Sequence, residues 1–131
     1  MEIDKVALIR IEKGKVLMTK SFGKDKYYLP GGKREKGESD EQTLVREIAE
    51  ELDVEILTDT VTYNGTFRAQ ADGKKKGVTV KMTCYSAQYN RQPRPRNEIE
   101  EVRWMNFGDI DLVAEVDKKI FKYLKEKGEL V

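Results

Sequence analysis

Residues 32–54 read GKREKGESDEQTLVREIAEELDV, and this stretch determines how the rest of the sequence is interpreted. Ser39 followed three residues later by Gln42 is a capping box, which marks a helix start. Asp40 and Glu41 come next, in the first turn, where the positive end of a helix favours acids. We therefore expect a helix that begins near Asp40. Apolar residues then recur at spacings of three and four and predict one stripe facing a core: Leu44, Val45, Ile48 and Leu52.

The same stretch carries an unbalanced negative charge. Between Glu35 and Glu55 there are nine acids and two bases, a net charge of −7, whereas the rest of the chain has 23 bases and 15 acids. At about 100° per residue, Glu47, Glu50 and Glu51 converge on a face beside the apolar stripe. Charged triplets of this kind are often an ordinary solvated face, but unmatched carboxylates repel one another. Hard oxygen ligands suit Mg²⁺ or Mn²⁺, and the pattern favours such an ion.

The residues in front of the helix are Leu29-Pro30-Gly31-Gly32. A glycine pair permits a tight turn, and it also lets the backbone approach a ligand closely. The two interpretations are compatible.

Together these residues form one pattern: Gly32, five residues, Glu38, seven residues, Arg46-Glu47-Ile48, one residue and Glu50-Glu51. The pattern resembles the signature box of the Nudix hydrolases, enzymes that cleave nucleoside diphosphates linked to another moiety. The resemblance implies metal binding by the three helix glutamates and by the backbone carbonyl of Gly31. It further implies that Arg46 orients a neighbouring glutamate and that Glu38 shapes the loop-helix-loop.

One position departs from the family pattern. Asp53 stands where the family usually has a glycine that ends the helix in the left-handed conformation. Aspartate tolerates that conformation better than most residues. We expect a small cost in stability and intact chemistry.

Length and composition limit the remaining possibilities. The 131 residues suit one domain spanning residues 1–131. Charged residues make up 37%, and no apolar run is long enough for a membrane span or a secretory signal, so we expect a soluble, cytoplasmic protein. The chain has no histidine, which excludes an imidazole base or a His-ligated zinc. Cys84 lies in an apolar alternating run and is predicted to be a buried thiol rather than a nucleophile.

Beyond the box, the pattern is that of an α/β protein. Amphipathic spacing predicts a second helix through Val116, Ile120, Phe121 and Leu124, with Gly128 as its cap. Pro93 and Pro95 make 90–97 a loop. The predicted strands are Val6–Ile11, Lys15–Thr19, Val54–Asn64, Thr66–Gln70, Val78–Tyr89 and Val102–Phe107. Two helices and several strands in this order fit an α/β/α sandwich with a mixed sheet, and the Nudix resemblance implies that topology.

Glu98 is the strongest candidate outside the box. It follows the proline loop and stands six residues before Trp104, as a further metal-binding glutamate does in MutT-type members of the family. A carboxylate there would bind metal or act as general base, whereas the alternative is a solvated loop acid. Glu100 and Glu101 compete for the same role.

Several basic residues are candidates for binding substrate phosphates. Arg94 and Arg96, close to Glu98, are favoured because guanidinium matches phosphate in a bidentate fork, and Arg10 is a weaker candidate. The lysines at 74–76 are better explained as solubilising surface. Gly32 is the backbone candidate for substrate contact.

The function these residues indicate is metal-assisted hydrolysis of a phosphoanhydride. The resemblance favours the MutT type, which converts a (d)NTP, oxidised nucleotides included, to (d)NMP and pyrophosphate with Mg²⁺ or Mn²⁺ as cofactor. Glu47, Glu50, Arg46 and Glu98 would be the catalytic residues. ADP-ribose, dinucleoside polyphosphates and an RNA 5′ end are alternative substrates, and a nucleotide-sensing module without catalysis is an alternative of another class. Nudix domains often pair, so a homodimer is also considered, while other nucleic acid and membranes are not expected partners.

Overall fold

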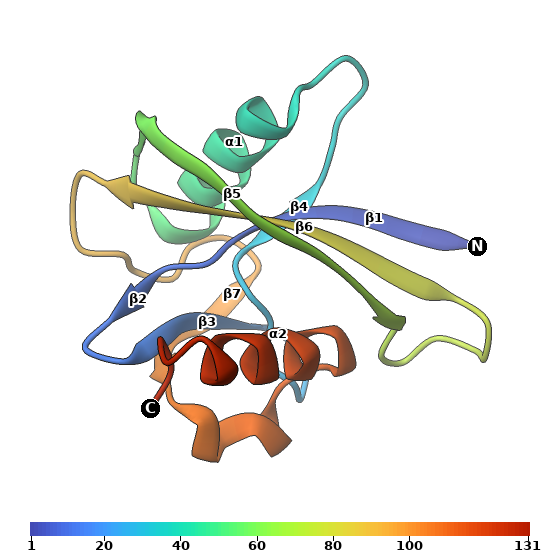
Figure 1. The fold of residues 1–131 in the computed structure, drawn as a ribbon. Helices are drawn as coiled ribbons and strands as arrows, with labels where there is room; N and C mark the ends of the chain where they lie inside the picture. Colours follow the sequence, from blue (N-terminus) through green and yellow to red (C-terminus); the bar gives the residue numbers. More distant parts are fainter.

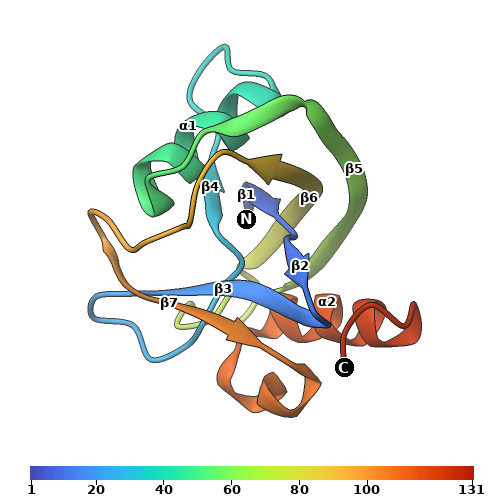
Figure 2. The same ribbon diagram turned by 90° about the vertical axis from the view of Figure 1, so that its left-hand side faces the viewer.

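The computed structural model describes residues 1–131 and shows strands enclosed between two helices (Figure 1). A four-stranded mixed sheet has the order β4-β1-β6-β5, and a three-stranded antiparallel sheet has the order β2-β3-β7. Helix α1 packs against the first sheet and α2 lies across the far side (Figure 2). The predicted α/β/α sandwich with a mixed sheet is confirmed. The elements are β1 (Glu2–Leu8), β2 (Ile11–Glu12), β3 (Lys15–Ser21), β4 (Gly31–Lys33), α1 (Asp40–Leu52), β5 (Ile56–Gln70), β6 (Thr79–Tyr89), β7 (Ile99–Met105), the 3₁₀ helix η1 (Phe107–Leu112) and α2 (Glu115–Glu126).

Both predicted helices are present. Helix α1 starts at Asp40, and the predicted capping box is complete: the Gln42 N–H donates to Ser39 Oγ (3.1 Å) and the Ser39 N–H donates to Gln42 Oε1 (2.9 Å). In α2 the four predicted apolar residues are all buried, and Gly128 follows the cap residue Lys127 with a φ of +77°. Neither helix is long and apolar enough to cross a membrane.

Several strand predictions were wrong in their extent. The first predicted strand, Val6–Ile11, is two elements, because the chain leaves one sheet after Leu8 and enters the other at Ile11. Its true start is Glu2, because β1 pairs in parallel with β6 along its whole length. Charged residues at positions 2, 4 and 5 conceal this from an apolar pattern.

The predicted break at Asn64-Gly65 is instead a register shift inside the single strand β5. Gly65 has a φ of +140°, so the strand bends there and continues its pairing with β6. The strand predicted at Val102–Phe107 is β7 and starts earlier, at Ile99, immediately after Glu98.

The interior has two apolar clusters, one on each side of the main sheet. The stripe of α1 packs with β1 residues such as Val6 and Leu8, while α2 covers the other side with Ile120 and Phe121. Cys84 is fully buried there, as predicted. The α1 cluster fixes the helix relative to β1, and it therefore fixes the direction in which the carboxylates of α1 point.

Candidate metal centre

Glu51 is the buried member of the α1 carboxylates. Its side chain lies beside the apolar stripe, 7% exposed, and Oε1 accepts a hydrogen bond from the Gly31 N–H at 3.0 Å. The pKa of Glu51 is raised to about 8, mainly by burial. The charges of Glu47 and Glu98 also raise this pKa, whereas the hydrogen bond from Gly31 lowers it. An ionised carboxylate here is costly unless a cation compensates it.

The two glycines make room for this arrangement in different ways. Gly31 has a φ of +147°, and a Cβ there would lie 2.1 Å from the Val6 carbonyl oxygen of β1. A Cβ on Gly32 would lie 2.5 Å from the Glu47 carboxyl group. Gly31 therefore lets β4 approach β1, whereas Gly32 leaves the space that Glu47 occupies. Metal ligation by the Gly31 carbonyl stays a prediction.

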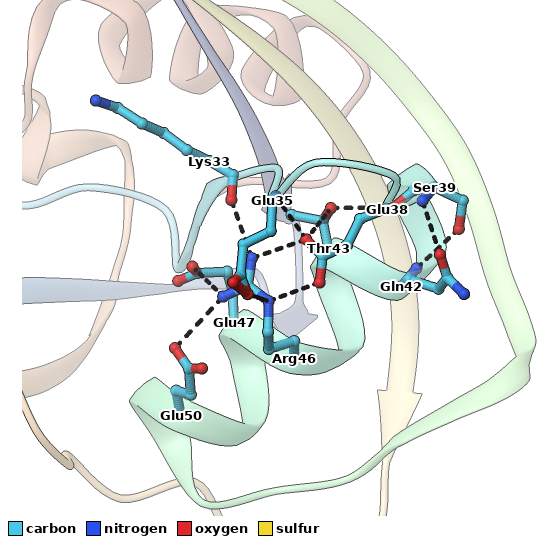
Figure 3. A network of polar contacts seen from close by, with 9 residues as sticks. All are labelled: Lys33, Glu35, Glu38, Ser39, Gln42, Thr43, Arg46, Glu47 and Glu50. Carbon is cyan, nitrogen blue, oxygen red and sulfur yellow. Dashed lines mark hydrogen bonds and ion pairs between the residues drawn. The ribbon is translucent and has the colours of Figure 1, made fainter.

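Arg46 connects the loop before α1 to Glu47 (Figure 3). Its Nε donates to Glu38 Oε2 (2.7 Å) and its NH2 to the Lys33 carbonyl (3.0 Å), while NH1 donates to Glu47 Oε1 (2.8 Å). Glu38 also accepts from the Glu35 N–H and the Thr43 hydroxyl, and the Arg46 guanidinium is the main cause of its pKa, which is lowered to about 2. Arg46 thus holds Glu47 in place, and Glu38 joins the loop to the helix.

Glu98 completes a group of three carboxylates. Oxygen atoms of Glu47, Glu51 and Glu98 all lie within 4.8 Å of one another. Glu98 comes from the exposed β6–β7 loop, and the other two come from successive turns of α1. Three hard oxygen donors at this spacing, with one of them buried, fit the ligand preference of Mg²⁺ or Mn²⁺.

Glu50 was expected to share one site with Glu47 and Glu51, but its side chain lies apart from theirs. It lies outside the group of three, its side chain is 49% exposed, and Oε2 faces Arg46 NH1 at 3.5 Å. Glu47 and Glu51 are one helical turn apart and point the same way, whereas Glu50 is rotated toward solvent and toward the guanidinium.

A pocket opens beside Glu51 between the two sheets. It is lined by Gly31 and Gly32 and by Tyr28 and Leu29. Lys5 of β1 also lines the pocket, with Nζ 5.4 Å from the centre of the Tyr28 ring. The pocket is therefore lined by Glu51, by apolar side chains and by the ammonium group of Lys5. Lys5 was not predicted as a site residue, because a lysine in a strand gives no signal without knowledge of the strand register.

The predicted phosphate-binding arginines do not line this pocket. Arg10 lines a separate hollow, where it pairs with Glu12 and lies over the Tyr89 ring. Arg94 and Arg96 both bind the Asp53 carboxylate, so these guanidinium groups are engaged by the end of α1. By contrast, Lys74, which the sequence analysis assigned to solubilising surface, lines the pocket.

Asp117 of α2 is a second buried acid that sequence reasoning missed. It is fully buried; Oδ1 accepts from the Leu29 N–H at 2.9 Å, and Oδ2 has no partner. Burial raises the pKa of Asp117 to about 7. In the sequence it reads as an acid in the first turn of a helix, where exposed acids are common.

Comparison with known proteins shows that nearly the whole chain matches one protein domain family. A profile described as the NUDIX domain matches residues 4–125. The chain is also 30% identical over 96 residues to the mRNA-decapping enzyme subunit 2 of Saccharomyces cerevisiae strain YJM789. The aligned region covers 73% of this chain and 10% of that protein. This chain therefore spans a tenth of the length of that curated relative.

Solved structures agree on the fold. The MutT protein of Methanosarcina mazei Go1 superimposes with a TM-score of 0.77 at 20% identity, covering 97% of this chain and 95% of that one. A MutT NUDIX hydrolase of Burkholderia pseudomallei gives a TM-score of 0.75 at 20% identity, with 92% and 95% covered. At this identity the likeness concerns the fold alone.

Proposed function

Since the chain belongs to the Nudix hydrolase family, we propose that it hydrolyses a phosphoanhydride bond in a nucleoside diphosphate linked to another moiety, with Mg²⁺ or Mn²⁺ as cofactor. The observation that carries the proposal is the convergence of Glu98 with Glu47 and Glu51 within 4.8 Å. Glu51 lines the pocket, so a substrate bound in the pocket would lie next to this group.

The residues of this chain would have different roles in the reaction. Glu47, Glu51 and Glu98 would hold the cation, and Arg46 keeps the Glu47 carboxylate oriented. Glu50, on the next face of the helix, would join them by rotation about its side-chain bonds. A bound divalent cation neutralises phosphate oxygens and lowers the pKa of a coordinated water. One of the glutamates not fully engaged by the cation would accept the proton of the attacking water.

The pocket suggests how substrate is placed. Lys5 and Lys74 line it together with Glu51, so a polyphosphate in the pocket would meet positive charge as well as this carboxylate. Tyr28 and the apolar residues that line the pocket would contact the nucleoside. We favour a (d)NTP, with (d)NMP and pyrophosphate as products, because Glu98 stands six residues before Trp104, as a further metal-binding glutamate does in MutT-type members of the family, and lies close to Glu47 and Glu51.

An RNA 5′ end is the second candidate substrate. The observation that favours it is the 30% identity to a protein named as an mRNA-decapping enzyme subunit. The carboxylate chemistry would be the same, and only the occupant of the pocket would differ.

The test is a substrate panel. Purified protein would be incubated with canonical and oxidised (d)NTPs, ADP-ribose, dinucleoside polyphosphates, 5′-triphosphorylated RNA and capped RNA, each with Mg²⁺, with Mn²⁺ and with EDTA. Hydrolysis in ¹⁸O-labelled water would show which phosphorus is attacked. Metal-dependent pyrophosphate release from triphosphates supports the favoured substrate. Release of a capped nucleotide transfers the assignment to RNA, and no turnover of any compound would contradict the proposed activity.

A further inference from the structure

Asp53 ends α1 in the left-handed conformation, with φ 56° and ψ 39°, and its N–H donates to the Ala49 carbonyl at 3.2 Å. Its carboxylate is held from two sides. Arg94 Nε donates to Oδ2 at 2.8 Å, and Arg96 NH1 donates to Oδ1 at 2.7 Å. The Asp53 side chain is only 17% exposed, so the two arginines cover it.

The backbone of the same loop caps the end of the helix. The last carbonyls of a helix have no partner within the helix itself. Here the Arg94 N–H donates to the Leu52 carbonyl (3.0 Å), and the Arg96 N–H donates to the Glu51 carbonyl (3.0 Å). Asn97 Nδ2 donates to the Glu50 carbonyl (2.7 Å). The loop is therefore docked on α1 through both main chain and side chains, as its path past the end of α1 also shows (Figure 2).

Glu98 follows this docked segment directly. The Ile99 N–H donates to the Arg96 carbonyl (3.0 Å), which closes a turn around positions 97 and 98, and the Glu98 carbonyl accepts from the Phe22 N–H (2.9 Å). With only Asn97 between Arg96 and Glu98, the position of the Glu98 carboxylate depends on where the arginines hold the loop.

We propose that Asp53 is a positioning residue, which holds Glu98 against Glu47 and Glu51 by binding Arg94 and Arg96. The proposal rests on the proposed function for the meaning of the metal centre. A glycine at position 53 would adopt the left-handed conformation with less strain, but it offers the arginines nothing to bind. The aspartate therefore has a use that the family's usual glycine cannot supply.

The decisive variant is Asp53→Gly, with Glu55→Gln as the matched control, because Glu55 is exposed, lies two residues away and makes no side-chain hydrogen bond or ion pair. Mn²⁺ affinity would be measured by titration calorimetry without substrate. Outer contacts that orient a metal ligand typically contribute 10–100-fold in metal affinity. We expect Mn²⁺ affinity to fall about 10-fold or more in Asp53→Gly and to stay unchanged in Glu55→Gln, while the melting temperature of Asp53→Gly is not lowered.

A double mutant shows whether Asp53 influences Mn²⁺ affinity through the position of Glu98 or independently of Glu98. If Asp53 acts through Glu98, then Asp53→Gly lowers Mn²⁺ affinity little further in a Glu98→Gln background. Amide exchange at positions 94–98 should accelerate in Asp53→Gly without metal. Wild-type Mn²⁺ affinity in Asp53→Gly, or two losses that add in full, would overturn the proposal. These measurements need no substrate, so a failure of the proposed hydrolysis would be recognised separately in the substrate panel.

Discussion

The buried acid Asp117 leads to a quantitative prediction about stability and pH. Its side chain is fully buried, and the charged groups that influence it are Lys5 of β1 and Asp72 of the β5–β6 turn. The pKa of Asp117 rises from 3.8 to about 7, with burial as the largest cause. The Asp117→Asn variant keeps the acceptor oxygen for the Leu29 N–H and removes the titration.

Proton linkage determines whether folding stability rises or falls with pH. Because the folded state holds this proton more tightly than the unfolded state, folding stability is lost as pH rises from about 4 to about 7, and the loss levels off above that. A shift of about three pKa units corresponds to about 4 kcal/mol in total. Between pH 5 and pH 8 the wild-type protein should lose about 2–3 kcal/mol of stability relative to Asp117→Asn.

Urea unfolding followed by the fluorescence of Trp104, the single tryptophan, measures both proteins at pH 5, 6, 7 and 8 in EDTA. Other groups titrate in both proteins, so the difference between the two curves isolates Asp117. Curves that stay parallel across this range would refute the claim that Asp117 is buried and protonated near neutral pH.

Four further substitutions test the metal centre and its helix. Glu51→Gln keeps the shape and the acceptor for the Gly31 N–H, so turnover should fall by on the order of 10²-fold or more while the circular dichroism spectrum is unchanged; wild-type turnover would exclude Glu51 from the chemistry. Gly32→Ala places a Cβ against the Glu47 carboxyl group, so turnover should fall about 10-fold with little loss of stability, whereas Gly31→Ala, which meets β1 backbone, should lower the melting temperature instead. Ser39→Ala removes the acceptor for the Gln42 N–H and should cost about 1 kcal/mol in urea unfolding without changing Mn²⁺ affinity.

The parts of this molecule that the sequence predicts best are those determined by near neighbours. The start of α1 depends on Ser39 and Gln42, which are three residues apart, so the capping box alone locates it. The buried stripe of α1 and the buried face of α2 follow from helical spacing in the same way.

The features that sequence reasoning missed depend on distant segments. The start of β1 at Glu2 depends on pairing with β6, and a bend at Gly65 cannot be told from a strand end without knowing the partner strand. The proximity of Glu98 to Glu47 was expected from family resemblance, whereas the reason for it, the docking of Arg94 and Arg96 on Asp53, is not readable from any local pattern. Lys5 and Asp117 were missed for the same reason, because their burial depends on tertiary packing.

The parallel pairing of β1 with β6 has a consequence for the order in which the protein matures during synthesis. Glu2 pairs opposite Thr79, so β1 must wait for most of the chain to emerge from the ribosome before its place in the sheet exists. Glu98 emerges later still. A nascent chain thus carries the whole box long before it can assemble the carboxylate group, and hydrolytic competence arrives together with the completed fold.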